Sequence, residues 1–450
     1  MKKKILFLTG LVCQCWAVQA QHSSPTTWNE NTGAPLTIQP EIPVFGQSTI
    51  EYKRKGKSVL KVQLAEPALI TVASKPEKWG YVQFPDITRT TDGTIATKWN
   101  MADDAMEAYG HAPTPSAIST DGGKTWKQNP NRWEDSGAGE GVQLPNGDWI
   151  KIMTPPAIKD EELTLPKPAG TVIRGKTAYT MYKISELPPN RQGVFLARRR
   201  KGERTWQAEQ ATLDDPQALR YSLRGMIPVV WWGDLKVAAD GSVIAGVYPG
   251  YYLKNDGMPD QKGGTFFYRS TDNGHSWKIL SRIPYQPDLR IDTSGHRHQG
   301  FTEPAFEILN DGTYLCVMRT TDRDYGPMYA SHSTDAGKTW SKPKIITPNG
   351  VLPRLLQLKN GVTVVSAGRP GVQLRFSTDG KGETWTNAFD MLPYEKGESV
   401  SSERITCGYT GLLATGANTF LVIYSDFAHK NEQGEIRKAI KVREVTVSPL

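Results

Sequence analysis

The string STDGGKTW at Ser119–Trp126 decides the fold, because it returns three times along the chain. The later copies read STDNGHSW at Ser270–Trp277, STDAGKTW at Ser333–Trp340 and, one residue longer, STDGKGETW at Ser377–Trp385. A degenerate version, RRRKGERTW, covers Arg198–Trp206. Ser and Asp side chains tie down the backbone of a turn, and glycine takes its left-handed position. We therefore predict that each copy is a turn whose Trp begins and covers an outer strand.

A second repeat underlies the first, because stretches of alternating apolar residues are broken by a tight turn six times. Asp-Gly or Asn-Gly in such a stretch is the strongest short-range indication of a hairpin, and we expect both turn residues at positive φ. The turns lie at Gly93, Gly147, Gly241, Gly312, Gly361 and, more loosely, Gly416–Asn418. In four units a full copy of the string follows the hairpin, so each unit supplies about four short strands.

Repeating units of roughly 45–95 residues with four strands each indicate a β-propeller. Six hairpins predict an all-β protein built as one six-bladed β-propeller over residues 46–450. The last unit supplies only three strands of its own. We expect SVLKVQL at 58–64 or ALITVAS at 68–74 to complete that sheet and close the ring.

The first twenty residues predict an export signal. MKKK is basic, ILFLTGLVCQCWAV is apolar, and small residues end at Ala20, where we expect cleavage. The mature protein is then periplasmic or secreted, with no membrane span, and residues 21–45 form a polar, Pro-rich leader. Without the three lysines of the signal, the net charge is +5.

The charge is mild, which fits an acidic small ligand, and no basic stripe indicates nucleic-acid binding. We expect neither a cofactor nor a metal, since no metal-ligand spacing occurs. Two cysteines remain after the signal, Cys316 and Cys407. They either pair, as an oxidising compartment allows, or are two buried thiols.

The hairpin turns also locate one mouth of the propeller, where innermost strands start and second strands end. Counting back from each turn brings five candidates to the strand starts: Gln83, Trp231, Glu303, Arg354 and Tyr409. Counting forward brings Arg319 and Arg369 to the second-strand ends. Three arginines, a glutamate and a tyrosine at one mouth indicate a site for an acidic ligand, although each could also be a core residue or part of a structural ion pair.

The repeated string resembles the Asp box, or BNR repeat, and a six-bladed propeller with such repeats resembles the sialidase (neuraminidase) superfamily over about residues 75–448. GFTEPAFEILNDGTYLCVMRT, SAGRPGVQLRFSTDG and CGYTGLL resemble family segments. The resemblance implies that Tyr409 is the nucleophile and that Glu303 takes its phenolic proton. It implies that Arg319 and Arg369 hold a substrate carboxylate. A neutral nucleophile suits an anomeric carbon that already bears a carboxylate. The Asp-box aspartates themselves are turn residues.

Two departures concern the first blade. VQFPDITRTTDG has Gln83 where the family has its first arginine, so we expect weak turnover of simple sialosides and a gain from Gln83→Arg. The catalytic acid is displaced into KWNMADDAMEAYGH, where Asp104 is our choice over Asp103 and Glu107. With one arginine fewer, Arg354 or Arg89 is a further candidate for holding the substrate. The terminal sugar is then a different acidic one or a neutral one.

Three functions follow from these residues. The first is a sialidase-like glycoside hydrolase, an exo-glycosidase acting on a terminal sugar of a glycan. The second is a polysaccharide lyase that cleaves next to a uronate and abstracts its C5 proton with His or Tyr. The segment SGHRHQGFTEP, with His296, Arg297 and His298, allows it. The third is a propeller that binds glycans without turnover. In each, Trp231 or Trp232 either stacks on a sugar face or packs in the core.

Overall fold

The computed structural model describes residues 41–90, 92–129, 141–320, 326–394 and 405–450. The predicted export signal and most of the predicted leader therefore lie outside the described residues. Within these residues, no helix has both the length and the apolar character needed to cross a membrane. Helical structure there consists of single 3₁₀ turns: η1 (Met106–Ala108), η2 (Asp160–Glu162), η3 (Ile184–Glu186), η4 (Pro189–Arg191) and η5 (Gly295–Arg297).

Six antiparallel blades follow one another along the described residues, and the outer strands of blades two and three pair in parallel, so that these two blades belong to one larger sheet. Their strands, from inner to outer, are listed by blade. Blade one has β5 (Tyr81–Arg89), β6 (Ile95–Met101), β7 (Ser116–Ser119) and β8 (Lys127–Asn129). Blade two has β9 (Val142–Gln143), β10 (Trp149–Ile152), β14 (Val194–Arg199) and β15 (Gln207–Asp214). Blade three has β18 (Trp232–Val237), β19 (Val243–Tyr252), β20 (Gly264–Ser270) and β21 (Ser276–Ile283).

The second half of the chain repeats this pattern. Blade four has β22 (Thr302–Ile308), β23 (Tyr314–Arg319), β24 (Met328–Ser333) and β25 (Lys344–Thr347). Blade five has β26 (Val351–Gln357), β27 (Thr363–Gly368), β28 (Val372–Ser377) and β29 (Phe389–Asp390), with β1 (Ile42–Pro43) parallel to β29. Blade six has β30 (Thr410–Ala414), β31 (Thr419–Lys430) and β32 (Ile436–Pro449).

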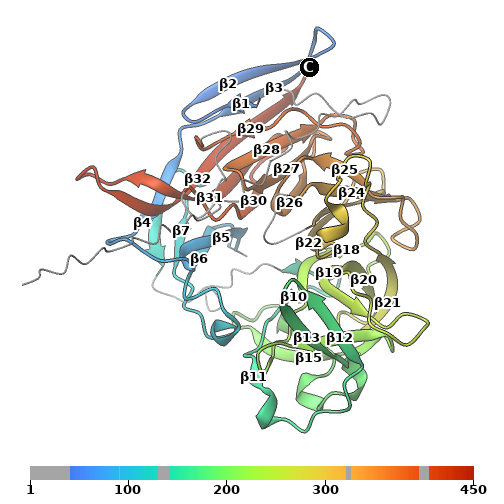
Figure 1. Ribbon diagram of the computed structural model, residues 1–450. Helices are drawn as coiled ribbons and strands as arrows, with labels where there is room; N and C mark the ends of the chain where they lie inside the picture. Colours follow the sequence, from blue (N-terminus) through green and yellow to red (C-terminus); the bar gives the residue numbers. More distant parts are fainter. Residues whose placement is uncertain (1–40, 91, 130–140, 321–325, 395–404) are drawn as a thin grey trace, which may run out of the picture. The chain divides into compact units, whose positions relative to one another are not determined.

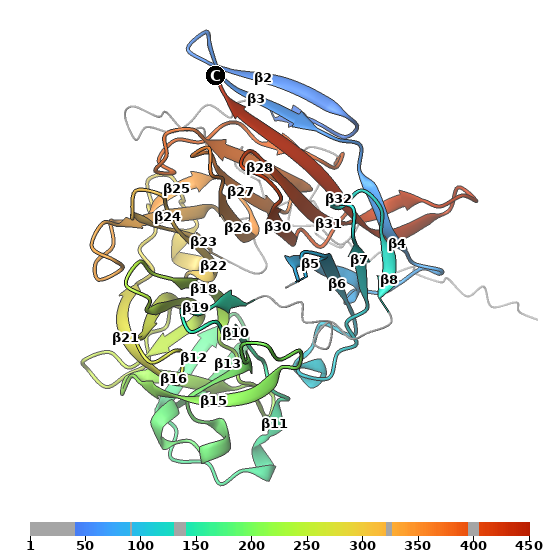
Figure 2. The same cartoon turned by 180° about the vertical axis from the view of Figure 1, so that it is seen from behind.

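The inner strands bring the blades into a ring. β18 contacts β22, β22 contacts β26, β26 contacts β30, and β30 contacts β5, so the last blade meets the first. Figures 1 and 2 show the sheets succeeding one another in chain order around a centre, from blue-green β5 to red β30. The predicted six-bladed propeller is confirmed.

The N-terminal part of the described chain completes blade six. β3 (Lys57–Leu64) pairs with the end of β32, and β4 (Ala68–Val72) pairs with its middle. Both segments offered by the sequence are therefore used, side by side on one long strand, and β2 (Ser48–Arg54) adds a further strand outside β3. This pairing confirms closure by an N-terminal strand.

The hairpin turns depart from the expectation in one respect. The five turn glycines from Gly93 to Gly361 have positive φ, but the Asp or Asn before each does not. Its side chain instead accepts a hydrogen bond from the backbone two residues on, as Asp311 does from Thr313 N at 2.9 Å. This is a type I turn followed by a glycine bulge, in which only one residue needs the left-handed region.

The four repeated strings are turns between third and outer strands, as predicted. In the copy at Ser333–Trp340, Ser333 Oγ donates to Asp335 Oδ1 at 2.7 Å and accepts from Gly337 N at 2.9 Å. Hydrogen bonds from the side chain and backbone of Thr339 lower the pKa of Asp335 to about 2. Trp340 then stacks on Phe267 of blade three, with ring centroids 4.2 Å apart. The tryptophan of this Asp box thus packs between neighbouring blades.

Blade two carries an insertion that no repeat predicted. A second sheet forms from β12 (Gly170–Arg174), β13 (Thr177–Lys183) and β16 (Ala218–Ser222), and β16 continues onto the end of β19. A short pair, β11 (Ile158–Lys159) with β17 (Met226–Ile227), flanks it. These segments account for the length of the second unit, and they appear in green in Figure 1.

Candidate active site

Three inner strands open with the same irregularity. Phe84, Glu303 and Leu352 each have positive φ, each precedes a proline, and the pairing register shifts at each. Bulges of this kind re-aim a side chain, and residues held at positive φ concentrate at functional sites. The sequence motif is visible as FP, EP and LP at equivalent strand starts. These three positions provide contacts within the candidate site.

Glu303 is the centre of a hydrogen-bonded cluster. The hydroxyl of Tyr409 donates to its Oε1. Arg319 Nη1 donates to its Oε2 at 2.6 Å, and the backbone N of Leu352 donates to the same oxygen at 3.0 Å. The carboxylate is 5% exposed. Blades four, five and six therefore converge on one carboxylate.

The charges in the cluster are set by this geometry. Burial opposes ionisation of Glu303, but the charge of Arg319 and the hydrogen bonds from Tyr409 and Arg319 outweigh it, so the pKa of Glu303 lies below its ordinary value. Burial and the neighbouring carboxylate raise the pKa of Tyr409 well above its ordinary value. The pair therefore consists of a neutral phenol and an ionised acceptor for its proton.

Arg369 lies over the ring of Tyr409. Its guanidinium carbon is 5.8 Å from the ring centroid of Tyr409 and 5.5 Å from that of Trp79. Arg369 Nε donates to the carbonyl of Cys407 at 3.2 Å. The side chain is half-buried, whereas Arg319 is only 2% exposed. Arg369 is thus the more accessible guanidinium, and Arg319 is directed at Glu303.

Asp104 joins the site through a tryptophan. Trp79 Nε1 donates to Asp104 Oδ2 at 3.0 Å, and the ring of Trp79 lies against Phe84, which in turn packs on Tyr409 at 5.0 Å between centroids. Asp103 points elsewhere, into an exposed ion pair with Lys78 at 2.6 Å. The geometry thus connects Asp104, and not Asp103, to the cluster.

Two of the sequence candidates are buried in ways that exclude contact with a substrate. Gln83 is fully buried, and its Oε1 faces Lys438 Nζ at 3.4 Å; the bulge points the next residue, Phe84, at Tyr409 instead. His298 has no exposed side-chain surface because its Nε2 pairs with Asp292 Oδ1 at 3.1 Å. Their burial gives no support to the expectation that these residues bind substrate.

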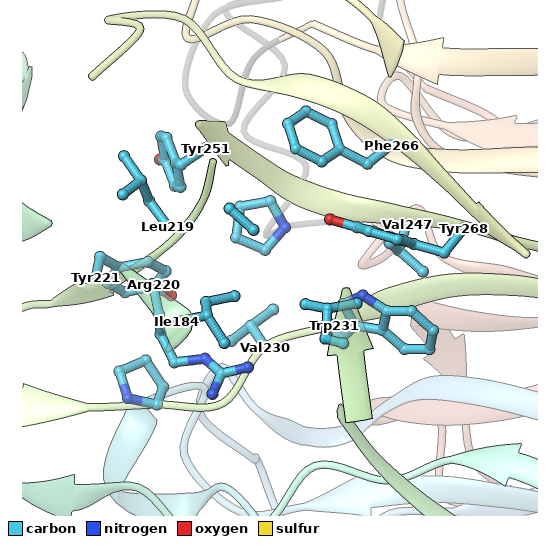
Figure 3. Close-up of a pocket in the computed structure, with 14 residues that line it drawn as sticks. Ile184, Leu219, Arg220, Tyr221, Val230, Trp231, Val247, Tyr251, Phe266 and Tyr268 are labelled. Carbon is cyan, nitrogen blue, oxygen red and sulfur yellow. The ribbon is translucent and has the colours of Figure 1, made fainter. Parts of the chain in front are cut away.

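Trp231 is also a core residue. It is 6% exposed and packs on Trp277 and Tyr268, with centroids 5.3 Å and 5.8 Å away. Figure 3 shows it in a pocket with Tyr268, Tyr221 and Arg220, and none of the pocket's lining residues belongs to the Glu303 cluster. Its neighbour Trp232 is half-buried, so its side chain is the more exposed of the two.

Arg354 lies further along its strand than the cluster. Its Nε donates to the carbonyl of Thr410 at 3.3 Å, and its Nη1 is 3.8 Å from Asp234 Oδ1. These contacts join the inner strands of blades three, five and six. They hold Arg354 between these strands, and they give no support to its expected role in substrate binding.

Two residues of the site were not foreseen. Leu352 contributes its backbone N–H to Glu303, and the repeated LP and EP dipeptides could have indicated it. Trp79 links Asp104 to Arg369, but the sequence marks it only as an aromatic residue before the first blade.

The two cysteines are free and buried. Burial raises the pKa of Cys407, whose Sγ lies 3.0 Å from Ser425 Oγ. Among the described residues, no group of three or more His, Cys, Asp or Glu side chains could hold a metal ion.

The comparisons agree with this architecture. Residues 199–408 match the family model described as the BNR repeat-like domain. The match confirms the predicted resemblance to BNR, or Asp-box, repeats over that part of the chain. No curated protein matches the chain at a significant level.

Solved structures are similar to the chain at low identity, and the first of them supports the fold. A Dyadobacter fermentans protein of unknown function is 17% identical with a TM-score of 0.57, covering 86% of this chain and 99% of that one. A Hadza microbial sialidase is 16% identical with a TM-score of 0.43; 82% of this chain aligns, but it spans only 65% of the sialidase. A Penicillium chrysogenum alpha-L-arabinanase, complexed with arabinobiose, is 15% identical with a TM-score of 0.46, covering 84% and 98%.

Proposed function

We propose that the protein is an exo-glycosidase that removes a terminal acidic sugar from a glycan, with Tyr409 as nucleophile. The observation that carries the proposal is the hydrogen bond from Tyr409 to a buried carboxylate that is kept ionised by Arg319. A tyrosine is a weak nucleophile unless a base takes its proton as it attacks. Glu303 is positioned and charged for that task. We also propose that the protein acts after export, as its predicted signal suggests.

The proposed reaction has two steps. In the first, Tyr409 Oη bonds to the anomeric carbon, its proton passes to Glu303, and Asp104 protonates the leaving oxygen. In the second, Asp104 takes a proton from water, the water oxygen bonds to the anomeric carbon, and Tyr409 leaves and regains its proton from Glu303. Two displacements retain the anomeric configuration.

Arg369 is the group proposed to hold the acidic function of the sugar. Its guanidinium is half-buried, lies between the rings of Tyr409 and Trp79, and uses Nε on a backbone carbonyl. An arginine held by a carbonyl and two rings is preorganised, so a carboxylate that meets it loses little further freedom. Arg319 contributes indirectly because it holds Glu303.

No specific observation favours the lyase alternative. The histidine considered for it, His298, has its side chain buried against Asp292. The non-catalytic alternative differs from the proposal only in turnover, so an experiment must separate them.

Incubation with a panel of acidic and neutral glycans, with the products weighed by mass spectrometry, tests the proposal. Hydrolysis adds the mass of water across the cleaved bond, elimination cleaves without adding it and leaves an ultraviolet-absorbing product, and a binder leaves the glycans intact. We expect release of a terminal acidic sugar with added water. Cleavage without water, or no cleavage of any glycan that binds, would overturn the proposal.

A further inference from the structure

Trp79 contacts two charged groups of the candidate site. Its Nε1 donates to Asp104 Oδ2 at 3.0 Å, and the guanidinium carbon of Arg369 is 5.5 Å from its ring centroid. The same guanidinium carbon is 5.8 Å from the ring centroid of Tyr409. Trp79, Arg369 and Tyr409 are all half-buried, so each keeps part of its surface open. One indole therefore contacts both the proposed acid and the proposed holder of the acidic group, beside the proposed nucleophile.

Blade six fixes the backbone and the ring of Trp79. Lys438 Nζ, from β32, donates to the carbonyls of Lys78 and Tyr81 at 2.6 Å and 3.2 Å. Phe427, from β31, packs edge-on against the indole with ring centroids 6.3 Å apart. The residues on both sides of Trp79 and its own ring are thus attached to the neighbouring blade.

The segment after Trp79 lies against the segment that carries Asp104. Gly80 has a φ of +98°, and a Cβ there would come within 2.1 Å of the carbonyl oxygen of Ala102, so the approach requires glycine. Asn100 Nδ2 donates to the carbonyls of Gly80 and Ala102 at 2.6 Å and 2.9 Å. Asp104 follows Ala102 by two residues, so this junction brings its carboxylate within reach of the indole N–H.

The orientation of Asp104 depends on that N–H. The Asp104 side chain is exposed, and among the residues that the structure describes Trp79 is its one hydrogen-bond partner. A group that donates a proton during a reaction must lie within hydrogen-bonding reach of the atom that it protonates. Misplacement by about 1 Å can slow a reaction about 100-fold. Loss of the N–H should therefore impair the acid even though the carboxyl group remains.

Arg369 depends on the ring of Trp79 and not on its N–H. A guanidinium over the face of an indole is attracted by the negative charge of the ring face. The carbonyl of Cys407 accepts from Arg369 Nε at 3.2 Å and fixes the other side of the group. The two contacts of Trp79 use different parts of one side chain, so substitution can separate them. Phenylalanine keeps a ring and loses the N–H, whereas leucine loses both.

We propose that Trp79 is a positioning residue of the glycosidase site. Its N–H orients Asp104 toward the leaving oxygen, and its ring holds Arg369 beside Tyr409. The inference rests on the proposed function and deepens it, because it assigns to one side chain the relative placement of the acid and the anion-binding group. Trp79 acts through these two residues and not on the bond that breaks.

Nuclear magnetic resonance of protein labelled with nitrogen-15 at tryptophan tests the contact without a substrate. The indole N–H signal of Trp79 is assigned by its absence from the Trp79→Phe variant. We expect Asp104→Asn to move this signal, because a neutral amide oxygen is a weaker acceptor than a carboxylate. Asp103→Asn should leave it in place, since Asp103 pairs with Lys78. A signal that neither variant moves would refute the contact and the proposal with it.

Steady-state kinetics test the role, with the methyl and 4-nitrophenyl glycosides of the sugar that the glycan panel releases. Trp79→Phe should lower kcat/KM roughly 10- to 100-fold on the methyl glycoside, whose leaving group needs a proton, and less than about 2-fold on the 4-nitrophenyl glycoside. In the Asp104→Asn background, Trp79→Phe should have little further effect. Equal losses on both glycosides, or an undiminished loss in that background, would refute the positioning of Asp104.

Trp79→Leu tests the second contact. It should lower kcat/KM on both glycosides and raise KM, because Arg369 loses the ring that holds it. A Trp79→Leu protein with the same KM as Trp79→Phe would refute the support of Arg369. Thermal melts show whether each variant is folded, and if the leucine variant is not, Trp79→Met takes its place.

Trp340→Phe is the matched control. Trp340 is also half-buried, and its Nε1 donates to Ser281 Oγ at 3.0 Å, in an Asp box outside the candidate site. Its kinetics should equal those of the unmodified protein. If Asp104→Asn slows both glycosides equally, the acid of the proposed function is wrong and the role of Trp79 is overturned with it. A failure confined to the Trp79 variants overturns the positioning and leaves the proposed function standing.

Discussion

The hydroxyl of Tyr409 donates its hydrogen bond to Glu303 although 106 residues separate the two in sequence. The tyrosine precedes the inner strand of blade six, and the glutamate lies in the bulge of blade four. Blade five, between them, supplies Leu352 N as a third contact to the carboxylate. Formation of the pair therefore requires three consecutive blades to be in place.

The substitution Tyr409→Phe removes only the hydroxyl. If Tyr409 is the nucleophile, hydrolysis should fall by roughly 10⁴-fold or more, as losses of catalytic nucleophiles do. Stability should change little, because Glu303 keeps its bonds to Arg319 and Leu352. Steady-state kinetics and a thermal melt of the same preparation check both. Hydrolysis within tenfold of the unmodified protein would contradict the assignment.

Glu303→Gln tests the charge of the base. Because the folded pKa of Glu303 lies below its ordinary value, its carboxylate stabilises the native state above the unfolded pKa, and this contribution is lost as pH falls through the folded pKa. The variant leaves Arg319 buried without its partner, which costs about 3–5 kcal/mol at neutral pH. Urea titrations should show this difference shrinking as the medium becomes more acidic than the ordinary glutamate pKa. A difference that does not vary with pH would show that Glu303 does not titrate as described.

Gln83→Arg is now expected to destabilise the protein, not to improve turnover of sialosides. The site is fully buried beside Lys438, so a guanidinium there meets a like charge and no water. An uncompensated buried charge costs on the order of 3–5 kcal/mol. Gln83→Met, similar in length but uncharged, is the control and should cost under about 1.5 kcal/mol. A stable Gln83→Arg protein with raised sialoside turnover would restore the sequence-based expectation.

Arg369→Gln should separate acidic from neutral substrates. A hydrogen bond to a charged group contributes about 1.5–3 kcal/mol, so kcat/KM on an acidic sugar should fall roughly 10- to 150-fold. The loss on a neutral analogue should be several-fold smaller. Equal losses on both would mean that Arg369 only supports Tyr409.

Asp104→Asn and Asp103→Asn form a matched pair on one loop. Loss of the acid should slow cleavage of sugars with poor leaving groups by about 10²- to 10⁴-fold, and hardly affect activated aryl glycosides, which need no proton. Asp103→Asn breaks only an exposed ion pair with Lys78, so its rates should stay near those of the unmodified protein. The reverse ranking would move the acid to Asp103.

The sequence predicts the propeller well because its turns are local. Each Asp box and each Asp-Gly or Asn-Gly hairpin specifies its own backbone within a few residues, and six local signals add up to six blades. The segment carrying β12, β13 and β16 has no such repeat, so its sheet could not be predicted from a period.

The sequence predicted some residues of the candidate site and missed others. Counting from the turns found Glu303, Arg319, Arg369 and Tyr409, because strand starts and ends share one mouth in every blade. It failed at Gln83, since a bulge there rotates the neighbouring Phe84 toward the site, and register errors of one residue exchange the two sides of a strand. It failed at Trp231 for the same reason, while Trp232 next to it stays open.

The same bulged backbone conformation before a proline occurs in blades one, four and five. The residue in it is phenylalanine, glutamate or leucine, respectively. The bulged backbone conformation thus does not depend on which side chain it carries. It occurs in three blades, and only in blade four does it carry a carboxylate. A change of one side chain, such as Phe84→Glu or Leu352→Glu, would offer a second acidic group from a different direction around the same centre. The propeller therefore holds spare positions from which a new reactivity could be selected without rebuilding a loop.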